Sequence, residues 1–180
     1  MIRIVKKQRV PAVFAQIKNR RSDYDELLSN EKDELKALLI EEQGCKCAYC
    51  MSKINMANST IEHYIPRKGE HGDRTLSLDY RNLFAVCDTT RGRPADEQTC
   101  DVRKGDRLLH IDPRVQAHID TIIYERSGKI KSTFSSGEHN FDDELNQIEF
   151  ISKYVEKLSS PDDRTAYSGF LAYLLSQRLK

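Results

Sequence analysis

The chain has 180 residues, of which 38% are hydrophobic and 32% are charged, and its formal net charge is +1. This length allows one ordinary domain or a small core with appended helices, and the lean apolar content favours a core that a metal ion helps to hold together. The sequence has no apolar run of the roughly 18 residues that a membrane helix needs, and no secretory signal pattern follows its basic start. We therefore expect a cytoplasmic protein without a membrane segment.

Basic residues are concentrated at the N-terminus, where residues 1–21 contain seven Lys or Arg and no acidic residue. Such a segment either contacts phosphates or forms a solvated basic arm, and the sequence leaves both open. The near-neutral total charge argues against strong nucleic-acid binding by this chain alone. We therefore expect a partner to supply part of the affinity.

A helix or helical pair is predicted for residues 22–44. Leu35 and Leu39 recur at helical spacing, Ser29 or Asn30 can cap the start, and Gly44 can end the helix. The following residues, 45–107, are rich in turn-forming residues and predict short strands and loops.

Three short elements are predicted within this irregular part: a strand around residues 61–65, a second strand at residues 83–86, and a helix that begins at Cys100. Further along, residues 121–134 predict a β-hairpin. Residues 141–158 predict an amphipathic helix, and residues 162–179 predict a last helix. The predicted fold class is therefore α+β.

Four cysteines are spaced as ligands of a structural zinc ion, which tetrahedral thiolate sites hold tightly. Cys47 and Cys50 form a CxxC turn, whereas Cys87 and Cys100 are separated by a polar insert that can loop out. Cys45 is a competing ligand, but we prefer Cys47 because CxxC is the commoner zinc spacing. The alternative is that the cysteines are reduced thiols in a core.

A hydrolytic centre is indicated between the two pairs of cysteines. His63 is the candidate general base, and a hydrogen bond between its other ring nitrogen and Asn82 or a backbone carbonyl would hold it in one tautomer. Glu62 and Asp101 offer the oxygen ligands that Mg²⁺ or Mn²⁺ prefers. Candidate nucleic-acid contacts are the basic residues beside these motifs, with Lys104 expected to face a phosphate one helical turn after Asp101: Arg67, Lys68, Arg103 and Lys104.

This order of motifs resembles that of HNH nucleases, the ββα-metal or His-Me finger class. The resemblance covers residues 45–107 and rests on CxxC at 47–50, Glu62-His63, Asn82-Leu83, and Cys100-Asp101 with Lys104-Gly105. It implies a zinc-stapled ββα-metal core, flanked by the N-terminal and C-terminal helices, in which His63 activates water, Asn82 orients His63, and Glu62 and Asp101 hold the catalytic Mg²⁺ or Mn²⁺. Glu62 stands where the family more often has Asp, and Asp101 where it has Asn or His.

A narrower resemblance is to the PtuB family, the HNH component of Septu antiphage systems that is also found beside some retrons. It rests on the opening Met-Ile-Arg-Ile-Val-Lys-Lys, on Ile-Glu-His-Tyr-Ile-Pro-Arg and on Thr-Cys-Asp-Val-Arg-Lys-Gly. The resemblance implies an ATPase partner like PtuA and a role in defence against phage.

The expected organisation is an N-terminal arm and helix (1–44), an HNH nuclease core (45–107), and a hairpin with helices (108–180) that packs on the core or a partner. The expected activity is metal-dependent endonucleolytic hydrolysis of nucleic acid, with DNA favoured. An alternative is a zinc-binding adaptor that recognises nucleic acid or protein without cutting, which would need the thiols but not Glu62, His63 and Asn82. A zinc hydrolase or deaminase is disfavoured because four thiolates leave no open position on the metal.

Overall fold

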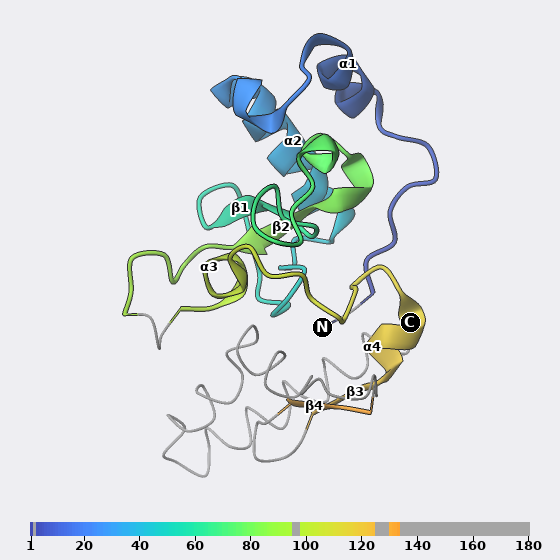
Figure 1. The fold of residues 1–180 in the computed structure, drawn as a ribbon, viewed down its shortest axis with the longest axis vertical. Coiled ribbons are helices and arrows are strands. Elements are labelled where there is room, and N and C mark those ends of the chain that lie inside the picture. The colour runs from blue at the N-terminus through green and yellow to red at the C-terminus, as the bar shows by residue number, and fades with distance from the viewer. Residues whose placement is uncertain (2, 95–97, 125–129, 134–180) are drawn as a thin grey trace.

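Helices and two small antiparallel sheets alternate along the chain in a computed structural model that describes residues 1, 3–94, 98–124 and 130–133 (Figure 1). The elements are α1 (Ala12–Arg20), α2 (Ser29–Glu42), β1 (Ser59–His63), β2 (Leu83–Cys87), α3 (Cys100–Lys104), α4 (Gln116–Asp120), β3 (Ile122–Tyr124) and β4 (Ile130–Ser132). Single turns of 3-10 helix are η1 (Tyr24–Glu26), η2 (Arg74–Leu76) and η3 (Tyr80–Asn82). The architecture is the small α+β arrangement that the sequence predicts.

The central sheet pairs β1 with β2 in antiparallel register, from Ser59 opposite Cys87 to His63 opposite Leu83. Every residue of β2 is buried, because α2 and α3 both pack on this strand. A strand buried on both faces reads as a continuous apolar run, which is why Leu-Phe-Ala-Val-Cys shows no alternation. The sheet and α3 form the strand–strand–helix order that the HNH resemblance implies.

Within the described residues, a side chain and not a third strand closes the free edge of β2. The Gln43 amide donates from Nε2 to the Ala85 carbonyl at 2.7 Å and accepts from the Ala85 amide at 2.8 Å. The Ala48 amide donates to the same carbonyl at 3.1 Å. The outward-facing backbone groups of Ala85 are therefore satisfied, as buried peptide groups require.

The predicted elements within the described residues are confirmed: α2 lies within 22–44, β1, β2 and α3 are present, and β3 pairs with β4 within 121–134. β1 ends at His63, two residues before the predicted limit. Beyond that point the Ile65 amide donates to the side-chain oxygen of Asn82 at 2.7 Å, so a side chain takes over from strand pairing. The predicted helices at 141–158 and 162–179 lie outside the described residues.

The N-terminal arm is docked on the core rather than solvated along its whole length. Ile4 is buried, and the Lys6 ammonium donates to the Leu83 carbonyl at 2.6 Å and to the Glu42 carboxylate at 3.0 Å. The same ammonium lies 4.7 Å from the ring centroids of Tyr80 and Phe84. Burial lowers the pKa of Lys6, and the charge of Glu42 opposes that shift. This ion pair links the arm to α2 and β2.

No helix among the described residues combines the length and apolar character that crossing a membrane demands.

We expect Glu42→Gln to destabilise the fold by about 3 kcal/mol, because it leaves the buried Lys6 ammonium without its counter-ion. Urea denaturation followed by circular dichroism measures the change. Glu41→Gln is the matched control, since Glu41 is the exposed preceding residue of α2. Equal stability of the two variants would show that the ion pair does not hold the arm.

Candidate functional site

Four buried thiols converge at one point of the structure. Their sulfur atoms lie within 4.8 Å of one another, and these are the sulfurs of Cys47, Cys50, Cys87 and Cys100. The Sγ–Sγ distances are 3.7 Å from Cys47 to Cys100, 3.6 Å from Cys50 to Cys87 and 3.3 Å from Cys87 to Cys100. A tetrahedral zinc ion with Zn–S bonds of about 2.3 Å needs sulfurs about 3.8 Å apart. The donor set therefore fits a closed structural zinc site.

Three chain segments supply the thiols. Cys47 and Cys50 lie on a tight turn in which the Met51 amide donates to the Cys47 carbonyl at 3.1 Å. Cys87 ends β2, and Cys100 begins α3. Met51 and Cys100 both have left-handed backbones, with φ of 63° and 54°. This conformation costs a non-glycine residue about 1 kcal/mol, so the turn and the helix start are held in place by their surroundings.

Thiols of the cluster shift one another's pKa values. Burial raises the pKa of the Cys47 thiol well above its ordinary value, and hydrogen bonds with the neighbouring thiols raise that of Cys100. Hydrogen bonds with the other thiols lower the pKa of Cys50. Only a metal ion lets all four act as thiolates together. Cys45 is exposed and stands outside the cluster, so the geometry agrees with the choice of Cys47.

His63, the last residue of β1, is held by a backbone carbonyl. Its Nε2 lies 3.0 Å from the Ser77 carbonyl oxygen, and its ring packs edge-on against Tyr24 with centroids 4.8 Å apart. Because a carbonyl only accepts, Nε2 carries the proton of the neutral ring and Nδ1 keeps a lone pair. Burial lowers the pKa of His63 to about 4, the bond to Ser77 opposes the shift, and the charge of Arg67 adds to it. The ring is therefore neutral at physiological pH.

Asn82 does not contact the His63 ring among the described hydrogen bonds, so of the two orienting groups considered, the carbonyl is the one observed. The Asn82 amide instead donates to the Ile65 carbonyl at 3.0 Å and to the Leu76 carbonyl at 3.2 Å. Leu76 directly precedes Ser77, whose carbonyl orients His63. Asn82 thus holds the segment that supplies the orienting group.

Glu62 points to a different set of neighbours from His63, as successive strand residues do. Its carboxylate accepts from the Lys104 ammonium at 2.7 Å and from the Tyr49 hydroxyl at 3.3 Å. Burial raises the pKa of Glu62 to about 7, although Lys104 opposes this, and the charge of Asp101 adds to it. Glu62 and Asp101 are therefore close enough to interact electrostatically.

Asp101, in the first turn of α3, is paired on one side only. Arg91 donates to its Oδ2, whereas Oδ1 is buried and has no hydrogen-bond partner within the described residues. Burial raises the pKa of Asp101. A buried carboxylate oxygen without a partner suits a hard cation such as Mg²⁺ or Mn²⁺, so Asp101 has the chemistry of a ligand of the expected catalytic metal.

The four basic residues expected to contact nucleic acid occupy unlike positions. Lys68 is exposed, Arg103 is half-buried, and Arg67 binds Asp25 at 2.5 Å. Lys104 differs from the expectation: its side chain is 0% exposed, and its ammonium also donates to the His63 carbonyl at 3.0 Å. A group so enclosed does not face a phosphate at the surface, so this placement of Lys104 is corrected. Its ammonium instead contacts the Glu62 carboxylate and the His63 backbone in the interior of the protein.

Sequence reasoning missed three groups around His63: the Ser77 carbonyl, Tyr24 and Asp25. The residue type of Ser77 gives no signal in the sequence, because its backbone carbonyl and not its side chain contacts His63. Tyr24 and Asp25 lie about forty residues from the loop they contact, and the sequence offers no motif that would pair them (for Arg67 and Asp25 the separation is 42 residues).

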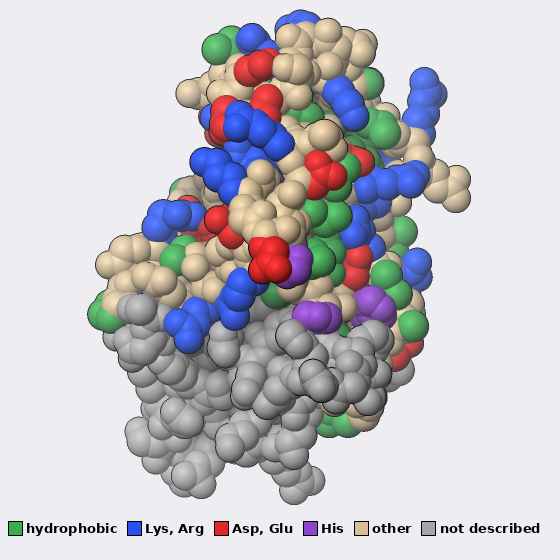
Figure 2. Space-filling view, viewed as in Figure 1, with side chains coloured by type: hydrophobic (Ala, Val, Ile, Leu, Met, Phe, Trp, Pro, Cys, Tyr) green, Lys and Arg blue, Asp and Glu red, His purple; other side chains and the backbone are tan. Residues whose placement is uncertain are grey.

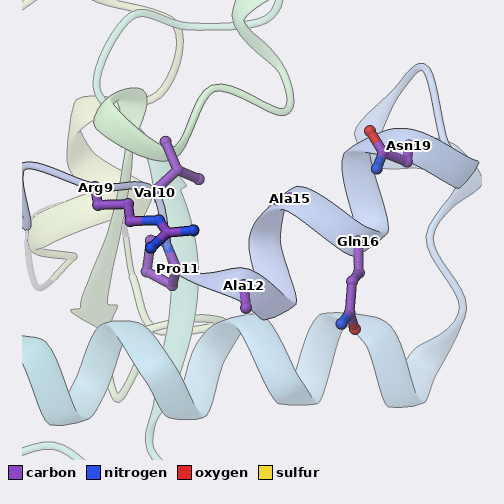
Figure 3. Close-up of a pocket in the computed structure, with 7 residues that line it drawn as sticks. All are labelled: Arg9, Val10, Pro11, Ala12, Ala15, Gln16 and Asn19. Carbon is purple, nitrogen blue, oxygen red and sulfur yellow. The ribbon is translucent and has the colours of Figure 1, made fainter.

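A separate shallow pocket lies where the N-terminal arm enters α1 (Figure 3). Arg9, Val10 and Pro11 line one part, and the remaining lining comes from α1 itself. None of its lining residues belongs to the thiol cluster or to the surroundings of His63.

The chain resembles segments of two longer curated proteins. Over 48 residues, or 27% of this chain, it is 42% identical to the CRISPR-associated endonuclease Cas9 of Corynebacterium diphtheriae, of which the match covers 4%. Over 71 residues, or 39% of this chain, it is 31% identical to the candidate HNH endonuclease of retron Vc95 from Vibrio cholerae, of which it covers 33%. The matches thus span a third or less of these relatives. Both are named endonucleases, which supports a nuclease function and an HNH relationship.

No protein-family model matches the chain. Among solved structures, the Type II-C Cas9 enzyme from Actinomyces naeslundii aligns with 78% of this chain and 12% of its own, at 21% identity and a TM-score of 0.34. This score is too low to indicate a shared fold.

We expect one tightly bound zinc ion per chain in protein purified without chelators. Cys47→Ser should lose the zinc and unfold the core, because the binding energy of a structural zinc is largely folding energy. Cys45→Ser is the matched control and should keep the metal. Elemental analysis and thermal melting measure both effects, and zinc retained by Cys47→Ser but lost by Cys45→Ser would reverse the ligand assignment.

The lowered pKa of His63 predicts a pH-dependent stability. Between about pH 4 and 6.5 the unfolded chain binds the proton that folded His63 excludes, so stability should rise with pH across this window by up to about 3 kcal/mol. Urea midpoints of the wild type and His63→Gln, compared from pH 4 to 7, isolate this contribution. Parallel curves for the two proteins would show that His63 is not buried in this way.

Proposed function

We propose that this chain is a cytoplasmic, metal-dependent HNH endonuclease that hydrolyses phosphodiester bonds of nucleic acid, with DNA the favoured substrate. The observation that carries the proposal is the placement of His63. Its Nε2 is engaged by the Ser77 carbonyl, which leaves Nδ1 as the acceptor, at the end of a strand whose preceding residue is a buried carboxylate. The similarity to named endonucleases supports the same conclusion.

His63 would act as the general base. Its Nδ1 would take a proton from the attacking water. The Ser77 carbonyl would hold the ring in place and stabilise the positive charge that develops on the imidazole. Asn82 holds the 65–77 segment, so it positions His63 through Ser77 and is not a proton acceptor itself.

Glu62 and Asp101 would hold the Mg²⁺ or Mn²⁺, which neutralises charge on the scissile phosphate and its leaving oxygen. Lys104 steadies Glu62 and the backbone of His63 from behind the strand.

The adaptor alternative has one observation in its favour. His63 is 8% exposed and lies under Tyr24, whereas a base must reach its water. A zinc-binding module that only recognises nucleic acid or protein would keep such a histidine buried. Cleavage assays separate the two functions.

The same proposal extends to the partner and the biological role. We infer an ATPase partner of the PtuA type, antiphage defence of the Septu kind, and docking through 108–180, with 1–44 as the arm and 45–107 as the nuclease core. Three apolar side chains of the described part of that region, Leu108, Val115 and Ile123, are exposed, as an interface would use. The retron association in one relative's name agrees with such a role.

We expect His63→Ala to lower Mg²⁺- or Mn²⁺-dependent cleavage by roughly 10²–10⁴-fold, the usual contribution of a general base. Cleavage of labelled DNA and RNA by the chain copurified with its genomic neighbours measures this. The exposed His71 provides the control His71→Ala, which should cleave normally with unchanged zinc content. Full activity of His63→Ala would reject the mechanism and favour the adaptor.

A further inference from the structure

The surroundings of His63 include a charged cluster that the catalytic scheme does not use. It is formed by η1, with Asp23 just before it, and by the loop that follows β1. Arg67 Nη1 lies 2.5 Å from Asp25 Oδ1, Arg74 Nε lies 2.6 Å from Asp23 Oδ2, and Arg74 Nη2 lies 3.2 Å from Asp25 Oδ2. Two guanidinium groups thus face two carboxylates beside the candidate base.

This cluster is joined directly to the His63 ring. Tyr24 lies between the two aspartates in the sequence and packs on the His63 ring. The Arg67 guanidinium carbon lies over the Tyr24 ring, 5.0 Å from the ring centroid. The Tyr24 amide donates to the Ser77 hydroxyl at 3.4 Å, and Ser77 is the residue whose carbonyl holds His63. A ligand that binds these arginines therefore lies next to the base, and η1 forms part of its cover.

The chemistry of the arginines indicates what they would bind. Guanidinium groups present planar, paired donors that match carboxylates and phosphates alike. The two carboxylates therefore occupy positions that phosphate oxygens can take. The side chain of Arg74 is 61% exposed and that of Asp25 is 52% exposed, and ion pairs at such positions are weak. A polyanion can displace them.

We propose that Arg67 and Arg74 form a phosphate-binding subsite for nucleic acid beside His63, which the carboxylates of Asp23 and Asp25 fill in the free protein. Binding of a phosphodiester releases the carboxylates and moves Tyr24 off the imidazole. The segment Asp23–Glu26 is then a built-in competitor of the substrate. This inference rests on the proposed function for the identity of the ligand.

On the face drawn in Figure 2, basic and acidic side chains are interspersed over the described part without a continuous basic field. Long-range attraction of nucleic acid is correspondingly limited on this face. Release of paired arginines is a way to create local positive charge where the reaction takes place.

The test measures binding of a short fluorescein-labelled DNA duplex by anisotropy at fixed salt, without added magnesium. The full-length, zinc-loaded chain carries His63→Ala in every sample, so that the duplex stays intact. Asp25→Asn should raise the affinity by roughly two- to fivefold, the range that an exposed ion pair spans. Asp33→Asn is the matched control for charge, since Asp33 is exposed on α2.

The decisive comparison repeats Asp25→Asn in an Arg67→Gln, Arg74→Gln background. If Asp25 acts by filling the arginine subsite, its removal there should have no more effect than Asp33→Asn. A gain that persists without the arginines, or one that Asp33→Asn reproduces, would overturn the subsite. So would a loss of affinity in Asp25→Asn with thermal melting unchanged. The His63→Ala cleavage assay fails or succeeds independently, because the binding cycle requires no hydrolysis.

Discussion

Convergence of four thiols from three chain segments is the constraint on which the rest of the structure depends. The core is lean, and the site elements are short: β1 and β2 have five residues each, and so does α3. Elements of this length do not hold a defined geometry by their own hydrogen bonds. The cysteines fix both the end of β2 and the start of α3, and the CxxC turn is tied to the middle of β2 through Ala48 and Ala85.

This constraint reaches the candidate site through β2. The strand runs from Leu83, which pairs with His63, to Cys87, which joins the thiol cluster. α3 carries both the fourth thiol and the carboxylate of Asp101, and its Lys104 contacts Glu62 and His63. His63 and the two carboxylates are thus placed by elements that share one anchor. Such support explains how a small core can hold the groups of the candidate site in a defined geometry.

The sequence predicted the parts of this site that depend on local spacing. CxxC marks a turn, alternating apolar residues mark β1, and Cys100 marks a helix start, and each of these is found. The parts that depend on distant contacts were not predictable. Lys104 follows Asp101 by three residues and looks like a surface cation, yet tertiary packing buries it. His63 is oriented by a backbone carbonyl, for which any residue type would serve, and its cover comes from Tyr24, far earlier in the chain.

The Gln43 amide has a consequence for the protection of the edge of β2. An unpaired strand edge is a template on which another chain can add a strand, and proteins protect such edges to avoid association. β2 has no third strand beside it within the described residues, and at Ala85 the Gln43 side chain meets the outward peptide groups in its place. Because Ala85 is fully buried, a shortened side chain at this position would leave its amide without a hydrogen-bond acceptor, at a cost in stability.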